Sequence, residues 1–89
     1  MIATIDERVR EPKAGSYTCE LLNSGLRRIA QKVGEEGVEV ALAAVSQDNN
    51  ALLNEAADLL FHLCVLLRAK GLRLEDVSGI LQRRHQFTV

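Results

Sequence analysis

Two pairs of acidic residues with the same spacing constrain the fold of this 89-residue chain more than any other feature. Glu36 and Glu39 form the first pair, and Glu55 and Asp58 form the second. Residues three apart lie on one face of an α-helix, so each pair presents two carboxylates to the same side. The fifteen residues between the pairs are enough to finish one helix, turn and begin another. The spacing therefore predicts two antiparallel helices that bring four carboxylates together.

Apolar residues at three- and four-residue steps extend this prediction to most of the chain. Ser16 is a good helix N-cap, and Gly25 and Gly71 are typical helix stops. Asn49 or Asn50 in the polar segment 47–50 is expected to cap the following helix. We expect helices at about residues 17–23, 26–46, 51–69 and 75–86. The predicted fold class is all-α, a small helical bundle of about four helices.

Residues 1–15 do not follow a helical apolar period. Charged residues are frequent in this segment, and Pro12 and Gly15 indicate a turn. We expect a flexible N-terminal tail at residues 1–15, followed by an all-α domain at residues 16–89.

The aliphatic content is high for so short a chain. Hydrophobic residues make up 47% of the sequence, but only three residues are aromatic. Domains of this size bury a modest fraction of their surface, so part of the aliphatic surface is expected to face another subunit. The segment 51–69 is apolar nearly all round and should be buried on most sides. We predict a homo-oligomer, most simply a homodimer that completes the bundle.

Charge and targeting features exclude several classes of protein. The net charge of -1 provides no basic field for nucleic acid or an anionic membrane. The N-terminus lacks the apolar region of a secretory signal, and residues 56–67 are fewer than the ~20 needed to span a bilayer. Cys19 and Cys64 have no metal-ligand spacing, and Cys64 is predicted to be a core residue. We expect a cytoplasmic protein with no nucleic-acid or membrane partner.

The acidic pairs lack nearby cations. Like charges at this spacing destabilise a helix unless something offsets them. No Lys or Arg follows any of the four residues by one turn, and only Lys32 lies one turn before Glu36. Glu55 and Asp58 also interrupt an apolar surface, where a carboxylate is costly unless it is paired or binds a metal. A divalent cation with oxygen ligands, Mg2+ or Mn2+, would stabilise this arrangement.

An alternative needs no metal. The carboxylates could form a solvated acidic face, or a salt-bridge network with Lys32, Arg27 and Arg28. One acidic pair alone would favour that interpretation. Two matched pairs on consecutive helices, one of them in apolar surroundings, favour the metal.

Other polar residues align with the acidic pairs. Lys32 precedes Glu36 by one turn and is a candidate phosphate ligand. His62 follows Asp58 by one turn, and structural and functional roles for it are evenly balanced. The basic run Arg83, Arg84 and His85 is either a solvated helix end or a phosphate clamp.

Together these motifs resemble the MazG-like all-α nucleotide pyrophosphohydrolases. Within that group, four segments look like the phosphoribosyl-ATP pyrophosphatase family of histidine biosynthesis. They are Ser-Tyr-Thr at 16–18, Lys-Val-Gly-Glu-Glu at 32–36, Glu-Ala-Ala-Asp-Leu-Leu-Phe-His at 55–62 and Arg-Arg-His at 83–85. Phe61 departs from the family, in which we expect Tyr. The 89 residues include no cyclohydrolase portion, so we expect the free-standing form of the family.

The resemblance implies a reaction and a set of roles. The family hydrolyses phosphoribosyl-ATP to phosphoribosyl-AMP and pyrophosphate, with Mg2+ and as a helical dimer. By position, the metal ligands would be Glu36, Glu39, Glu55 and Asp58. Glu35 and Glu36 would be catalytic, Glu35 as a further ligand or as a base. Substrate and phosphate would meet Lys32, His62, Arg83, Arg84 and His85.

The implied chemistry agrees with these residue types. A metal-activated water would attack between the α and β phosphates, and no nucleophilic side chain is required. The alternatives are another MazG-like pyrophosphohydrolase that acts on (d)NTPs, and a non-enzymatic helical interaction module. The number of metal ions, and whether two subunits share a site, stay open at this point.

Overall fold

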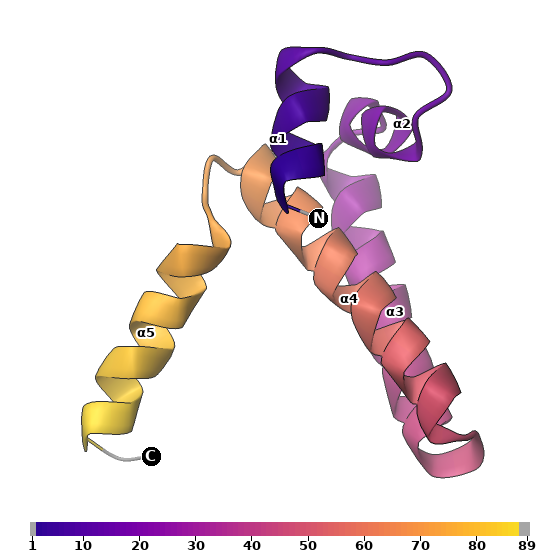
Figure 1. Cartoon of the computed structure of the whole chain (residues 1–89), viewed down its shortest axis with the longest axis vertical. Helices are drawn as coiled ribbons and strands as arrows, with labels where there is room; N and C mark the ends of the chain where they lie inside the picture. Colours follow the sequence, from indigo (N-terminus) through magenta and orange to yellow (C-terminus); the bar gives the residue numbers. More distant parts are fainter. Residues whose placement is uncertain (1, 88–89) are drawn as a thin grey trace.

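The computed structural model describes the backbone of residues 2–87 and the side chains of residues 2–84. Within that range the chain forms five α-helices and no β-strand, which confirms the predicted all-α class (Figure 1). The helices are α1 (Ile2–Arg10), α2 (Tyr17–Asn23), α3 (Leu26–Ser46), α4 (Asn49–Ala69) and α5 (Leu74–Phe87).

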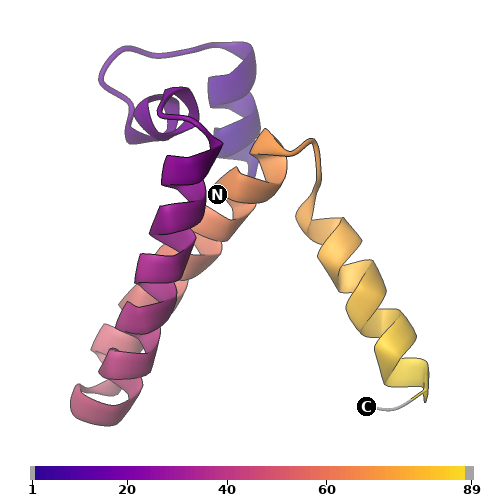
Figure 2. The same cartoon turned by 180° about the vertical axis from the view of Figure 1, so that it is seen from behind.

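Helices α3 and α4 form a long antiparallel hairpin, which both views show (Figures 1 and 2). Helix α3 has the predicted bounds, whereas α4 begins at Asn49, two residues earlier than expected. Asp48 is the N-cap, because its carboxylate accepts a hydrogen bond from the Ala51 amide at 2.8 Å. The cap is therefore one residue before the two asparagines considered from the sequence.

Capping and backbone conformation also set the bounds of the neighbouring helices. Ser16 caps α2 as predicted, and its hydroxyl accepts a hydrogen bond from the Cys19 amide at 3.4 Å. Gly25 and Gly71 have φ angles of 95° and 75°, a region that residues with a side chain rarely adopt. These glycines let the chain change direction before α3 and after α4.

Residues 2–10 form helix α1 instead of the predicted flexible tail. Ile5 is only 1% exposed and belongs to the core, and Ile2 packs against that core. The Asp6 carboxylate accepts a hydrogen bond from Arg68 Nε at 3.0 Å, which links α1 to the end of α4. The expectation was wrong here because the apolar residues are few and the charged residues around them obscure the period.

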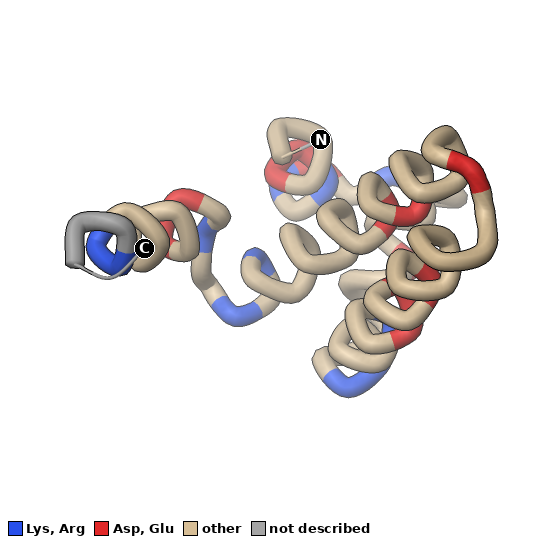
Figure 3. Tube along the Cα trace, turned by 90° about the horizontal axis from the view of Figure 1, so that it is seen from below, with Lys and Arg blue, Asp and Glu red and all other residues tan. Residues whose placement is uncertain are grey.

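Helix α5 diverges from the hairpin after the bend at residues 70–73 (Figures 1 and 2). Among the described residues it does not pack along any other helix. Acidic positions recur along the hairpin, whereas α5 ends in basic positions on the far side of the molecule (Figure 3). The fold therefore separates the two charged regions of a single chain.

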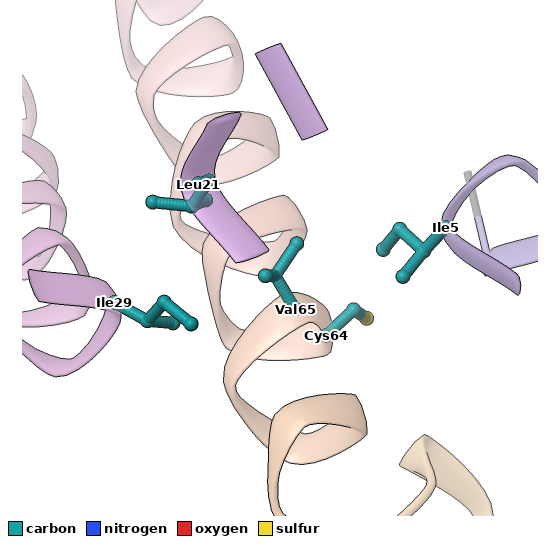
Figure 4. Close-up of a cluster of buried hydrophobic side chains, with 5 residues drawn as sticks. All are labelled: Ile5, Leu21, Ile29, Cys64 and Val65. Atoms are coloured by element: carbon teal, nitrogen blue, oxygen red, sulfur yellow. The ribbon is translucent and has the colours of Figure 1, made fainter. Parts of the chain in front are cut away.

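The hydrophobic core lies where α1 and α2 meet one end of the hairpin. Its side chains come from four helices and converge on one another (Figure 4). They are Ile5, Leu21, Ile29, Cys64 and Val65. Cys64 is 6% exposed, which confirms it as a core residue, and burial raises the pKa of its thiol. A buried thiol of this kind stays protonated and unreactive.

The other half of the hairpin has little core. Ala43 is the one buried hydrophobic residue there within the described part of the chain. Val38, Leu42 and Val45 are exposed on α3, and Leu53 is 68% exposed on α4. Helix α4 is long and apolar enough to cross a membrane by length and composition alone. Only 17% of its most apolar 18-residue stretch is buried within the chain. Burial on most sides, as predicted for this helix, is not achieved within one chain.

Candidate functional site

Three of the four predicted carboxylates come together on the hairpin. Glu36 on α3 and Glu55 and Asp58 on α4 each have a carboxylate oxygen within 4.8 Å of the others. Their burial differs, since Asp58 is exposed and the Glu36 side chain is only 12% exposed. Antiparallel packing of the two helices produces this group, as the spacing of the acidic pairs predicted.

Glu39 lies one turn along α3 from Glu36 and outside the group of three. Its charge still reaches the group. The pKa of Glu55 is raised, first by loss of hydration and then by the negative charges of Glu39, Asp58 and Glu36. Four carboxylates therefore repel one another here, which disfavours the ionised form of Glu55.

Lys32 is the cation closest to the carboxylates. Its Nζ lies 3.3 Å from Glu35 and 3.4 Å from Glu36. Burial lowers the pKa of Lys32, but the hydrogen bonds to Glu35 and Glu36 and the nearby Tyr17 hydroxyl outweigh it and raise the pKa overall. Lys32 therefore stays charged, but a single ammonium group does not neutralise four carboxylates.

Glu35 interacts with side chains of its own helix, α3. It accepts a hydrogen bond from Gln31 at 2.9 Å, and Arg28 lies 3.8 Å away. The hydrogen bonds from Gln31 and Lys32 lower the pKa of Glu35. This residue is therefore a stable carboxylate beside the group of three rather than a member of it.

His62 is buried behind the carboxylates, at 5% exposure. Its Nδ1 lies 2.7 Å from the Asp58 carbonyl oxygen and its Nε2 lies 2.8 Å from the Tyr17 hydroxyl. A carbonyl oxygen only accepts, so Nδ1 must carry a proton. In the neutral ring Nε2 then accepts the Tyr17 proton. Both nitrogens have partners, so His62 has no free nitrogen for a phosphate in this conformation.

Tyr17 completes a small aromatic group that the sequence did not place near the site. Its ring centroid lies 6.2 Å from that of Phe61 and 5.8 Å from that of His62. Tyr17 and His62 are 45 residues apart in the sequence, so no local pattern predicts their contact. The one available signal was the Ser-Tyr-Thr segment, which reads locally as a helix cap.

The two C-terminal arginines predicted to meet phosphate are not near the carboxylates of the same chain. Arg83 and Arg84 are exposed on α5, which diverges from the hairpin (Figure 3). The side chain of His85 lies outside the described residues.

Gly34 and Gly37 leave the surface of α3 open beside Glu36. A Cβ atom added at either glycine would meet nothing within 4 Å. Two glycines in a helix suggest a close approach of another segment, but no other part of the chain that the structure describes makes one.

Comparison with known proteins identifies the family. The sequence profile described as phosphoribosyl-ATP pyrophosphohydrolase matches residues 1–85. The chain belongs to this family. The match begins at the first residue, so the phosphoribosyl-ATP pyrophosphohydrolase profile also includes the segment that forms α1.

Two kinds of relative are similar to this member of the phosphoribosyl-ATP pyrophosphohydrolase family. The histidine biosynthesis bifunctional protein HisIE of Xanthomonas axonopodis is 63% identical over 84 residues, which cover 94% of this chain and 41% of that protein. The phosphoribosyl-ATP pyrophosphatase of Pyrobaculum calidifontis is 55% identical over 80 residues, covering 90% of this chain and 85% of that protein. The chain thus spans about two fifths of the bifunctional relative and most of the shorter one.

Proposed function

We propose that this chain hydrolyses phosphoribosyl-ATP to phosphoribosyl-AMP and pyrophosphate, the second step of histidine biosynthesis. One observation carries the proposal: a member of the phosphoribosyl-ATP pyrophosphohydrolase family has Glu36, Glu55 and Asp58 within 4.8 Å of one another. Oxygen ligands gathered on two rigid helices suit a reaction on phosphates.

The donor set fits Mg2+, and Mn2+ as a substitute. Hard divalent cations prefer carboxylate oxygens. The pKa of Glu55 is raised by loss of hydration and then by the negative charges of Glu39, Asp58 and Glu36, which Lys32 offsets only in part. The residues that would hold the ion are Glu36, Glu55 and Asp58, with Glu39 one turn away. When bound, Mg2+ lowers the pKa of a water ligand and clamps phosphate oxygens.

The side chains around the carboxylates bind and orient the substrate. Lys32 exchanges its contact with Glu36 for a phosphate oxygen and places the polyphosphate along α3. Glu36 and Glu35 are the catalytic candidates, Glu35 as a further ligand or as the base, since its neighbours keep it ionised. His62 helps to hold this arrangement through its hydrogen bond to the Asp58 carbonyl oxygen. Catalysis then rests on positioning and electrostatics, without a covalent intermediate.

A homodimer completes the fold in this proposal. The exposed apolar residues on the far half of the hairpin need a cover, and a second copy offers a matching surface. Dimerisation also provides a way for the basic end of α5, with Arg83, Arg84 and His85, to reach phosphate or ribose at the hairpin of the other copy. This interpretation accounts for the apolar surface of α4 without a membrane, and the net charge of -1 gives no attraction to nucleic acid. A cytoplasmic location is part of the same proposal.

The test is release of pyrophosphate from phosphoribosyl-ATP with and without Mg2+. We expect Mg2+-dependent release that Glu36→Gln and Asp58→Asn each reduce by at least about a hundredfold, the usual scale for removing a group that stabilises the transition state. Glu11→Gln, an exposed acidic residue in the irregular segment before α2, serves as the control and should leave the rate unchanged.

The same assay separates the alternatives. A clear preference for a dNTP over phosphoribosyl-ATP would assign the chain to another MazG-like activity. No hydrolysis of any nucleotide, together with no thermal stabilisation by Mg2+, would leave the non-enzymatic interaction module, because a ligand that binds the folded state must stabilise it.

A further inference from the structure

The surface of Tyr17 has no role in the reaction described so far. It is the single tyrosine of a chain that contains no tryptophan. Tyr17 begins α2 and is 49% exposed, yet its hydroxyl is tied to the buried ring of His62 at 2.8 Å. Because His62 engages the hydroxyl, a ligand that approaches Tyr17 would meet its aromatic ring rather than a free hydroxyl.

Neighbouring side chains hold the ring in one orientation. His62 binds the hydroxyl and packs edge-on against the ring, with an interplanar angle of 76°. Phe61 lies against it at a tilt of 33°. His62 is itself fixed to the Asp58 carbonyl oxygen. An aromatic surface that is fixed before a ligand arrives costs little conformational entropy on binding.

The hydrogen bonds of His62 to the Tyr17 hydroxyl and to the Asp58 carbonyl oxygen place the ring beside the carboxylates. His62 follows Asp58 by four residues, about 6 Å along α4. Lys32 Nζ lies 3.4 Å from Glu36, on the facing helix α3. The ring therefore stands next to the proposed phosphate site, within the length of a nucleotide.

We propose that the exposed ring of Tyr17 is the platform on which the nucleobase of the substrate stacks. This inference rests on the proposed function, since it names the part of the chain that receives the base of the same nucleotide. Purine bases stack readily on aromatic rings, and the stacking tolerates changes at the edge of the base. The phosphates would then extend from the ring toward Lys32 and the carboxylates.

The intrinsic fluorescence of the chain tests this directly, because Tyr17 is its sole strong emitter. We would titrate the unmodified chain with ATP and Mg2+, and in parallel with inorganic tripolyphosphate and Mg2+. N-acetyltyrosinamide at the same absorbance corrects for light absorbed by the base. Stacking predicts saturable quenching by ATP and none by tripolyphosphate. Phosphoribosyl-ATP has the adenine ring system and the triphosphate of ATP, with a further phosphoribosyl group on the edge of the base. Stacking tolerates such changes at the edge, so absence of quenching by ATP would overturn the proposal.

Variants of Tyr17 separate the ring from the hydroxyl. Tyr17→Phe and Tyr17→Trp keep an aromatic face, so their KM for phosphoribosyl-ATP should stay within about threefold of wild type. Tyr17→Leu should raise KM by about tenfold or more with little change in kcat, on the usual scale of one stacked base. If Tyr17→Phe raised KM as much as Tyr17→Leu does, only the hydroxyl would matter. If neither variant raised KM, the side chain would have no role in binding. Either result would also overturn the proposal.

Failure of this inference is distinguishable from failure of the proposed function. Quenching by ATP in a chain that does not hydrolyse phosphoribosyl-ATP would support the platform and remove the activity. Mg2+-dependent hydrolysis without quenching would support the activity and remove the platform. Melting temperatures of the three variants, measured alongside, identify any loss of activity that comes from unfolding.

Discussion

Lys32 Nζ lies 3.4 Å from Glu36, one of the three carboxylates that converge on the hairpin. One side chain thus has two competing partners in the proposed reaction. In the free chain Lys32 offsets part of the negative charge around Glu36. With substrate bound, the same ammonium group is needed at a phosphate.

Replacing Lys32 should therefore change metal and substrate binding in opposite directions. In Lys32→Met the carboxylates lose their nearest cation, so Mg2+ should bind more tightly, by a few fold. The same change should raise KM for phosphoribosyl-ATP by about tenfold or more, because a charge-assisted contact to phosphate is lost. Calorimetry with Mg2+ alone and steady-state kinetics measure the two effects separately. Lys70→Met, exposed at the end of α4, is the matched control. A loss of Mg2+ affinity in Lys32→Met would contradict this account.

Glu55 should destabilise the chain in metal-free buffer. Its pKa is raised by burial and by Glu39, Asp58 and Glu36, so the folded state binds the Glu55 proton more tightly than the unfolded state does. The contribution of Glu55 to stability is therefore greatest below its ordinary pKa of 4.5 and is lost as the pH rises through the raised value. Glu55→Gln should melt at a higher temperature than wild type at pH 7 in EDTA.

Two further measurements check that prediction. The difference in melting temperature between wild type and Glu55→Gln should narrow as the pH falls toward 4.5, where Glu55 takes up a proton. Added Mg2+ should stabilise wild type and have little effect on the variant. A variant that melts below wild type in EDTA at pH 7 would show that the repulsion is not significant.

Helix α1 should contribute to global stability. Ile5 is 1% exposed in the core, so Ile5→Ala should lower the free energy of unfolding by about 2–5 kcal/mol. Val9→Ala, on the same helix but 38% exposed, should lower it by less than about 1 kcal/mol. Urea denaturation at one fixed protein concentration compares them, because association with a second copy would add to the apparent stability. Equal effects would mean that α1 does not pack as described.

The apolar half of the hairpin should mediate dimerisation. Leu53→Asp replaces a side chain that is 68% exposed, so it should cost little stability within one chain. In a dimer the same position would bury an unpaired charge, and the variant should sediment as a monomer. Ala14→Asp, in the exposed segment before α2, should leave the association state unchanged. A wild-type chain that is already monomeric at high concentration would contradict the proposed dimer.

Local patterns predicted the hairpin well. The bounds of α3 follow from its apolar period and from the glycine before it, and the convergence of Glu36, Glu55 and Asp58 follows from helical spacing in two antiparallel helices. These features depend on residues that are close in sequence, or on one turn between two helices. Such short-range relationships can be inferred without coordinates.

Long-range relationships could not be predicted in this way. The Tyr17–His62 contact joins residues 45 apart, and nothing in either segment specifies the other. Helix α1 was missed because charged residues surround its few apolar ones, and the packing of Ile5 against α4 joins distant segments. The direction of α5 depends on the bend at residues 70–73, whose composition allows several paths.

The position of the core has a consequence for the behaviour of the chain on dilution. The core fixes one end of the hairpin, whereas Ala43 is the one buried hydrophobic residue in the described part of its other half. In the proposed dimer, contacts with the second copy would then largely set the distance between α3 and α4 in that far half, which follows Glu36 on α3 and precedes Asp58 on α4. Specific activity should fall as the protein is diluted below the dissociation constant of the dimer, while the helical content of each chain persists. For this chain, inactivation and unfolding would be separate events.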